Sequence, residues 1–225
     1  MDPTLIELWH SRAFMGTIKV FWLSQFIRYI MRPQKWFSET LKRVTQTRLR
    51  RLSCNAANDI DFKTCDYSNS TSCCQTIAVN SISKPFVSLH VRYGTKIIEQ
   101  PSQPLDKYMK FLTTKVKHIK DVYLSTETES VIQTLAEEYP EYSFYYLHYD
   151  RVQDLNLGVV DPSIDYVQEF LLSFTNLYIA IEATAFVGSL TSSWCVLIHQ
   201  LERTRGDGGA DYWSVDIGSQ YTSCF

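Results

Sequence analysis

The stretch Phe86–Lys96, FVSLHVRYGTK, decides the fold of this chain. It has the two-residue period of a β-strand, in which apolar positions alternate with polar ones: Val87, Leu89 and Val91 with Ser88, His90 and Arg92. His90 and Arg92 are therefore expected on one face at the carboxyl end of the strand, where open α/β sheets bind ligands. A guanidinium there suits a phosphate or carboxylate, because its planar fork donates two parallel hydrogen bonds. Lys96 adds a positive charge beyond the turn, although a structural histidine and a surface arginine are the simpler interpretation of these residues alone.

The composition indicates a globular protein without a strong charge. With 225 residues, 45% hydrophobic and 14% aromatic, the chain can form one large domain or two small ones around a filled core. A net charge of -2 argues against a nucleic-acid or anionic-membrane binder, which needs a basic excess. The first residues lack the apolar core of a secretory signal, and the apolar stretch 18–31 falls short of the roughly 20 residues of a membrane span. We expect a buried amphipathic helix there.

Strand-like and helix-like segments alternate from residue 86 onward. Besides the first strand, apolar runs predict strands over 122–126, 142–147, 186–189 and 212–215. Helical spacing predicts helices over 105–120, 131–139, 166–183 and 193–203, the last with an N-cap between Thr191 and Ser193. Two earlier helices are expected over 20–31 and 36–51, separated by Pro33. This order predicts an α/β fold, a Rossmann-like and mostly parallel sheet with helices on both faces.

A segment rich in cysteine separates the early helices from the sheet. Residues 52–84 have no hydrophobic period, which predicts a loop or insertion, and they hold Cys54, Cys65, Cys73 and Cys74. The spacing lacks the paired C-x2-C of a zinc site and favours disulfides. The sequon at Asn69 favours an oxidising secretory compartment, and the lack of an anchor suggests a partial gene model. We therefore divide the chain into an N-terminal helical segment packing on the lobe (1–51), the insertion (52–84) and the Rossmann-like lobe (85–225).

Three strand ends are expected to meet at the carboxyl edge of the sheet: 90–92, 125–127 and 188–193. The third, GSLTSS, offers amide N–H groups and hydroxyls at a helix start, which suits a phosphate. It has neither P-loop nor G-x-S-x-G spacing, so ordinary capping explains Ser192 and Ser193 as well as a nucleotide site or a hydrolase nucleophile does. Glu99 suits a general base, although such a residue is more often a solvated loop residue. Glu127 and Glu129 have no histidine or aspartate at ligand spacing, so no metal is expected.

Six sequence blocks follow one another between about Val20 and Asp216: WLSQFIRYIMRPQKWFSETLKRV, VSLHVRYGTK, PLDKYM, VYLST with a following acidic residue, EYPEYSF and AFVGSLTSSWC. Together they resemble the α-1,6-fucosyltransferases, the core fucosyltransferases of N-glycan processing and their bacterial nodulation relatives. The resemblance excludes the insertion near residues 52–83. It implies the donor-binding half of a two-lobed, GT-B-like glycosyltransferase, without the stem, the earlier half-domain and the C-terminal barrel of the family.

The resemblance also implies an activity and its site. L-fucose would pass from GDP-fucose, with inversion, to the innermost N-acetylglucosamine of an N-glycan in the Golgi lumen, with no metal or further cofactor, and a homodimer is one expected assembly. The donor would be held by His90 at the guanosine, Arg92 at the diphosphate, and Tyr108, Glu127, Ser192 and Ser193 around it. Lys96 would assist Arg92 at the leaving group. The base would be Glu99 if the loop lacks one residue and Gln100 otherwise, and Pro104 favours Glu99.

Departures from the family pattern support other interpretations. The family has His-Val-Arg-Arg-Thr-Asp-Lys where this chain has Tyr93, Gly94 and Thr95 before the lysine, and Trp194 replaces a glutamine. An expected aspartate falls near Asn176 or Leu177, and its loss leaves guanine N–H groups without an acceptor at a cost of roughly 1–3 kcal/mol. A second hypothesis is therefore a catalytically weak or inactive relative that binds a GDP-sugar or glycan. A third, with little support, is a hydrolase around Ser193 and Cys195.

Overall fold

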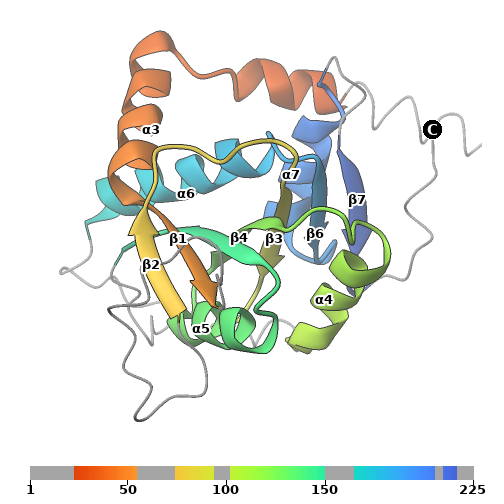
Figure 1. The fold of residues 1–225 in the computed structure, drawn as a ribbon. Helices are drawn as coiled ribbons and strands as arrows, with labels where there is room; N and C mark the ends of the chain where they lie inside the picture. The colour runs from red at the N-terminus through yellow and green to blue at the C-terminus, as the bar shows by residue number, and fades with distance from the viewer. Residues whose placement is uncertain (1–22, 55–73, 94–101, 150–164, 206–209, 217–225) are drawn as a thin grey trace, which may run out of the picture.

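A computed structural model describes residues 23–54, 74–93, 102–149, 165–205 and 210–216 (Figure 1). Its strands form one seven-stranded sheet in the order β2-β1-β5-β4-β3-β6-β7. The strands are β1 (Leu49–Cys54), β2 (Cys74–Ala78), β3 (Val87–Val91), β4 (Asp121–Thr126), β5 (Ser143–Leu147), β6 (Ala185–Gly188) and β7 (Asp211–Ser214). The helices are α3 (Lys35–Arg48), α4 (Leu105–Thr114), α5 (Glu129–Glu138), α6 (Tyr166–Ala180) and α7 (Ser193–Glu202), and residues 23–30 are also helical.

The sheet is doubly wound about β3. From β3 the chain moves outward through β4 to β5, then returns to the other side of β3 for β6 and β7, and all four pairings are parallel. The predicted mostly parallel α/β sheet is therefore confirmed. Because the winding reverses between β3 and β6, the switch point of the sheet lies between these two strands. The carboxyl ends of strands at a switch point are the usual ligand site of such folds.

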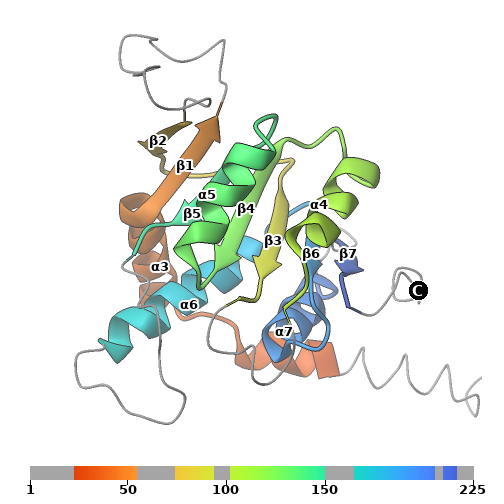
Figure 2. The same ribbon diagram turned by 90° about the horizontal axis from the view of Figure 1, so that it is seen from below.

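Helices cover both faces of the sheet (Figure 2). The side chains of Val87, Leu89 and Val91 pack in one cluster with residues of α4 and α5. On the opposite face, two smaller clusters join the sheet to α3, α6 and α7. Both faces of β3 are thus buried, so the alternation in its sequence separates the two faces of a central strand and does not mark a solvent side.

The segment around Cys54 differs from the prediction. The helix expected over 36–51 ends at Arg48, because Leu49–Ser53 pair with β5 in an antiparallel ladder. Part of the expected loop is also ordered, since Arg50–Cys54 pair with β2 and the disulfide Cys54–Cys74 joins the two strands. The predicted use of cysteine in disulfides is confirmed for this pair. Cys65, Cys73 and the sequon at Asn69 lie outside the described residues.

Two helix predictions need correction. The helix before Pro33 is not buried, because Phe26 and Ile30 are each 60% exposed. Ile27 and Met31 pack against the cluster formed by α6, α7 and the two strands beneath them. The helix expected over 105–120 ends at Thr114. The apolar period continues past that point because residues 116 and 119 are buried in the turns that lead to β4. Within the described ranges, every helix is too short or too polar to cross a membrane.

Candidate functional site

The structure brings the end of β3 and the start of α7 together at the switch point. His90 lies in β3, and its ring Nδ1 is 3.2 Å from the sulfur of Cys195 in α7. This approach depends on Gly188 at the end of β6. A Cβ atom at residue 188 would lie 2.6 Å from the Phe186 ring and 2.8 Å from the Cys195 sulfur, both closer than packing allows.

Arg92 follows β3 and is supported from the opposite face of the sheet. The phenol of Tyr108, from α4, is 1% exposed and hydrogen-bonds the backbone of Arg92. Burial, and next the nearby Cys195, raise the pKa of Tyr108 well above its usual value, so the phenol stays neutral. Tyr108 therefore lies beside Arg92 in the structure. Its role toward a donor stays a prediction.

Cys195 is fully buried, and burial raises the pKa of its thiol to about 12. The Ser189 backbone and the Ser192 side chain hydrogen-bond the sulfur and oppose that shift, as does the positive charge of Arg92. A thiol with this pKa is not ionised at neutral pH, and the thiolate is the nucleophilic form. The burial of Cys195 therefore argues against a cysteine nucleophile here.

Asp216, just after β7, holds the loop that precedes α7. Its carboxylate accepts the backbone N–H groups of Leu190 and Thr191 at 3.1 Å each, and the hydroxyls of three residues: Ser189, Thr191 and Ser214. Partial burial acts to raise the pKa of Asp216, but these hydrogen bonds outweigh it and hold the pKa well below its usual value. The sequence interpretation gave Asp216 no role. A carboxylate just after the last strand, at the same edge as the serine-rich loop, was the signal that could have found it.

The two serines of that loop differ. Ser192 is the N-cap residue of α7, inside the predicted range, but its side chain makes no capping hydrogen bond and is 4% exposed. Instead its hydroxyl reaches Cys195. Ser193, the first residue of α7, is exposed. Ordinary capping therefore does not account for Ser192, and the two serines face different surroundings.

The loop that carries Lys96 and Glu99 is bounded by a contact between its flanking residues. The Tyr93 hydroxyl donates a 2.9 Å hydrogen bond to the carbonyl of Gln103, immediately before α4. Tyr93, a departure from the family pattern, thus ties the end of β3 to the start of α4. Lys96, Glu99, Gln100 and Thr95 lie outside the described residues, so the structure places none of them.

Two further predicted positions lie on other elements. Glu127 follows β4 at the carboxyl edge and is exposed. Asn176, in α6, accepts a 2.6 Å hydrogen bond from Tyr123 and donates one of 2.9 Å to the Leu172 carbonyl. Its amide therefore joins α6 to β4, and Leu177 beside it is fully buried.

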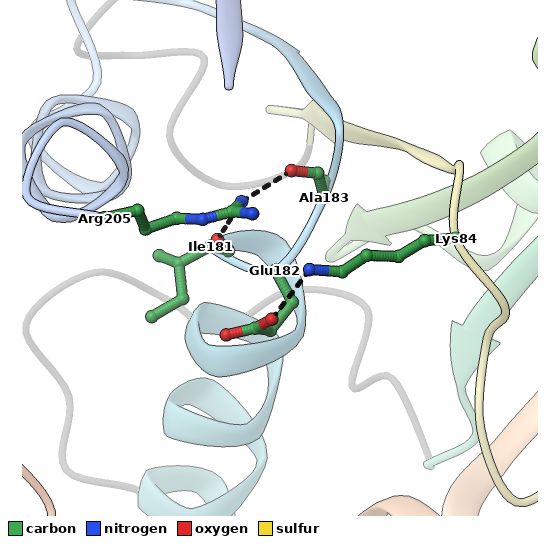
Figure 3. A network of polar contacts seen from close by, with 5 residues as sticks. All are labelled: Lys84, Ile181, Glu182, Ala183 and Arg205. Carbon is green, nitrogen blue, oxygen red and sulfur yellow. Dashed lines mark hydrogen bonds and ion pairs between the residues drawn. The ribbon is translucent and has the colours of Figure 1, made fainter. Parts of the chain in front are cut away.

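Two hollows lie elsewhere in the molecule. One, of about 430 Å³, is lined by α3, α6 and the segment before β3, and another, of about 650 Å³, lies between residues 25–33 and the ends of α6 and α7. Neither is lined by His90, Arg92 or Ser192. Two cations beside them make contacts within the fold (Figure 3): Arg205 donates to the carbonyls of Ile181 and Ala183 at 2.8 and 2.7 Å, and Lys84 pairs with Glu182 at 2.9 Å. In the part of the chain that the structure describes, no three His, Cys, Asp or Glu side chains form a metal-binding group.

No family model matches the chain. Among solved structures it is similar to a crystal structure of POFUT1 in complex with GDP, at 16% identity and a TM-score of 0.41 over 60% of this chain and 44% of that one. A POFUT1 structure in complex with GDP-fucose gives 18% identity and a TM-score of 0.39 over 60% and 43% of the two chains. The chain thus spans less than half of the length of these structures. At this identity and TM-score the likeness carries neither a family nor an activity over to this chain.

Proposed function

We propose that this chain binds GDP-fucose at the switch point between β3 and β6 and transfers L-fucose to a sugar hydroxyl. The observation that carries the proposal is the meeting of the end of β3 with the start of α7. There His90 Nδ1 is 3.2 Å from the Cys195 sulfur, and Arg92 follows β3 directly. The sequence resemblance names the nucleotide sugar, and the topology supplies the place at which such folds bind nucleotides.

The diphosphate is the part of the donor that these residues suit best. The Arg92 guanidinium matches a diphosphate in charge and in geometry. The first turn of α7, with Ser192 and Ser193, adds the amide N–H groups and positive dipole of a helix N-terminus. The negative charge of Asp216 nearby is offset by the N–H and O–H donors that surround it. In this proposal His90, Tyr108 and Glu127 border the rest of the donor.

The transfer step requires a base and a stabilised leaving group. Glu99 accepts the proton of the acceptor hydroxyl while that oxygen bonds to C1 of fucose, and the bond from C1 to the diphosphate oxygen breaks. GDP leaves with the electron pair, and the configuration at C1 inverts. Arg92 and Lys96 stabilise the charge on the departing diphosphate. Because these cations neutralise the leaving group, we expect transfer to be unchanged by EDTA.

The acceptor and the compartment follow from the sequence resemblance. We propose α-1,6 transfer to the innermost N-acetylglucosamine of an N-glycan, in the Golgi lumen. The disulfide between Cys54 and Cys74 supports an oxidising compartment, where such bonds persist.

A second candidate function is binding without turnover. It is favoured by Asn176, whose amide is hydrogen-bonded to Tyr123 and Leu172 where the family pattern expects a carboxylate for guanine. In this case the chain retains the diphosphate site but binds the guanine of the nucleotide weakly.

Calorimetry with GDP-fucose, followed by a transfer assay on an N-glycan acceptor, tests the proposal. We expect binding, transfer, and a roughly 10²–10⁴-fold loss of transfer rate in Glu99→Gln, the usual contribution of a general base. The control is Glu138→Gln, an exposed glutamate of α5, which should behave as the parent. Binding without transfer would favour the second candidate function over the first. If the chain binds neither GDP nor GDP-fucose, both candidate functions are overturned.

A further inference from the structure

The contact between His90 and Cys195 joins a strand to a helix at the proposed site, and one of its two atoms must carry a hydrogen. His90 Nδ1 and Cys195 Sγ are 3.2 Å apart, within hydrogen-bonding distance for sulfur. In a neutral imidazole one ring nitrogen donates and the other accepts. The direction of this hydrogen bond therefore fixes the tautomer of His90.

The surroundings of the sulfur decide that direction. The thiol stays protonated, because burial raises its pKa to about 12. The Ser189 backbone and the Ser192 side chain already hydrogen-bond the sulfur in a way that lowers its pKa, so they act as donors to it. Sulfur is a weak acceptor, whereas a bare imidazole nitrogen is a strong one. The arrangement is best satisfied when the S–H group donates to Nδ1.

We propose that Cys195 is a positioning residue that holds His90 as the Nε2–H tautomer, so that His90 offers a donor, and not an acceptor, to the bound nucleotide. The contact that fixes one ring nitrogen determines the role of the other. His90 would then select an acceptor atom of the ligand, such as a carbonyl or phosphate oxygen. The ligand part of this inference rests on the proposed function, whereas the tautomer does not.

Long-range ¹H–¹⁵N correlation spectra of the full chain, labelled with ¹⁵N-histidine, test the tautomer directly. A His90→Gln variant identifies the signals of His90. We expect the pattern of an imidazole protonated at Nε2 in the parent and in Cys195→Ser, which keeps a donor, and a changed pattern in Cys195→Ala. The control Ile198→Val removes one methylene from the same buried side of α7 and should leave the pattern as in the parent. An Nδ1–H pattern in the parent, or an unchanged one in Cys195→Ala, would overturn the inference.

Affinity for GDP provides a second readout. We expect Cys195→Ala to weaken GDP binding roughly 5-fold, the equivalent of one hydrogen bond of about 1 kcal/mol, and Cys195→Ser to restore most of it. Equal weakening in both variants would contradict the role of the thiol as a donor. If the parent does not bind GDP, the proposed function fails, and the spectra still decide the tautomer.

Discussion

Polar residues have different contacts at the amino and carboxyl ends of the parallel strands. Before β3 and β6, Lys84 pairs with Glu182, and Arg205 donates to the carbonyls at the end of α6. These cations stabilise helix ends and connections, although two hollows lie beside them. After the same strands, His90, Cys195 and Asp216 hold together the ends of three different elements around Arg92. The hollows and positive charges at the amino end therefore lie away from the site that we propose at the switch point of the sheet.

The largest effect on stability is expected from Gly188→Ala. The added methyl group would meet the Phe186 ring and the Cys195 sulfur below 3 Å, so β6 and α7 must move apart. We expect a loss of about 3 kcal/mol of unfolding free energy, measured by denaturant titration. A stability equal to that of the parent would show that the close approach of β6 and α7 is not required.

Asp216→Ala should reduce the free energy of unfolding slightly less than Gly188→Ala does. Its effect arises at the carboxyl edge of the sheet. It leaves the N–H groups of Leu190 and Thr191 without their acceptor, at a cost of about 2 kcal/mol. Because the folded-state pKa of Asp216 lies below its unfolded value, its stabilisation is present above about pH 4 and is lost as the pH falls through the folded pKa. The difference in stability between the parent and Asp216→Ala should therefore shrink in acid. A difference that grows as the pH falls would contradict this assignment.

At the opposite edge, Arg205→Ala should cost about 1–2 kcal/mol of stability, because two carbonyls near the end of α6 lose a charged donor. Its affinity for GDP should match that of the parent. Thermal unfolding and calorimetry on the same sample check both. A large loss of GDP affinity without a loss of stability would remove the distinction between the two edges.

The smallest effect is expected from Lys84→Ala. Lys84 and Glu182 form an ion pair whose side chains are 49% and 62% exposed, and such pairs contribute roughly 0–1 kcal/mol. We expect a melting temperature nearly equal to that of the parent, and the same for Glu182→Gln. A melting temperature clearly below the parent value in either variant would show that this edge depends on its ion pair.

The sequence predicted the elements whose conformation follows from local periodicity. It missed those that form only through pairing with distant parts of the chain. The alternation in β3 and the helical stripe of α5 are local, and both elements form where expected. β1 could not be found in this way, because its first three residues continue the pattern of the preceding helix and its last three have no period. Leu49–Cys54 becomes a strand only by pairing with β5 and β2. The same holds for the site. His90, Arg92 and Ser192 follow from strand ends, whereas the contacts of Cys195 and Asp216 arise only when α7 and β7 pack beside β3 and β6.

The most direct test of the difference between the two edges is to measure the GDP affinity of two variants, Arg92→Ala and Arg205→Ala. Removing a charged hydrogen-bonding group from a bound diphosphate costs roughly 2–5 kcal/mol, so calorimetry should detect little or no GDP binding by Arg92→Ala. Arg205→Ala should bind GDP as the parent does, although it is less stable. GDP binding by Arg92→Ala at parental affinity would contradict the account, because the ligand would then lie away from the switch point between β3 and β6.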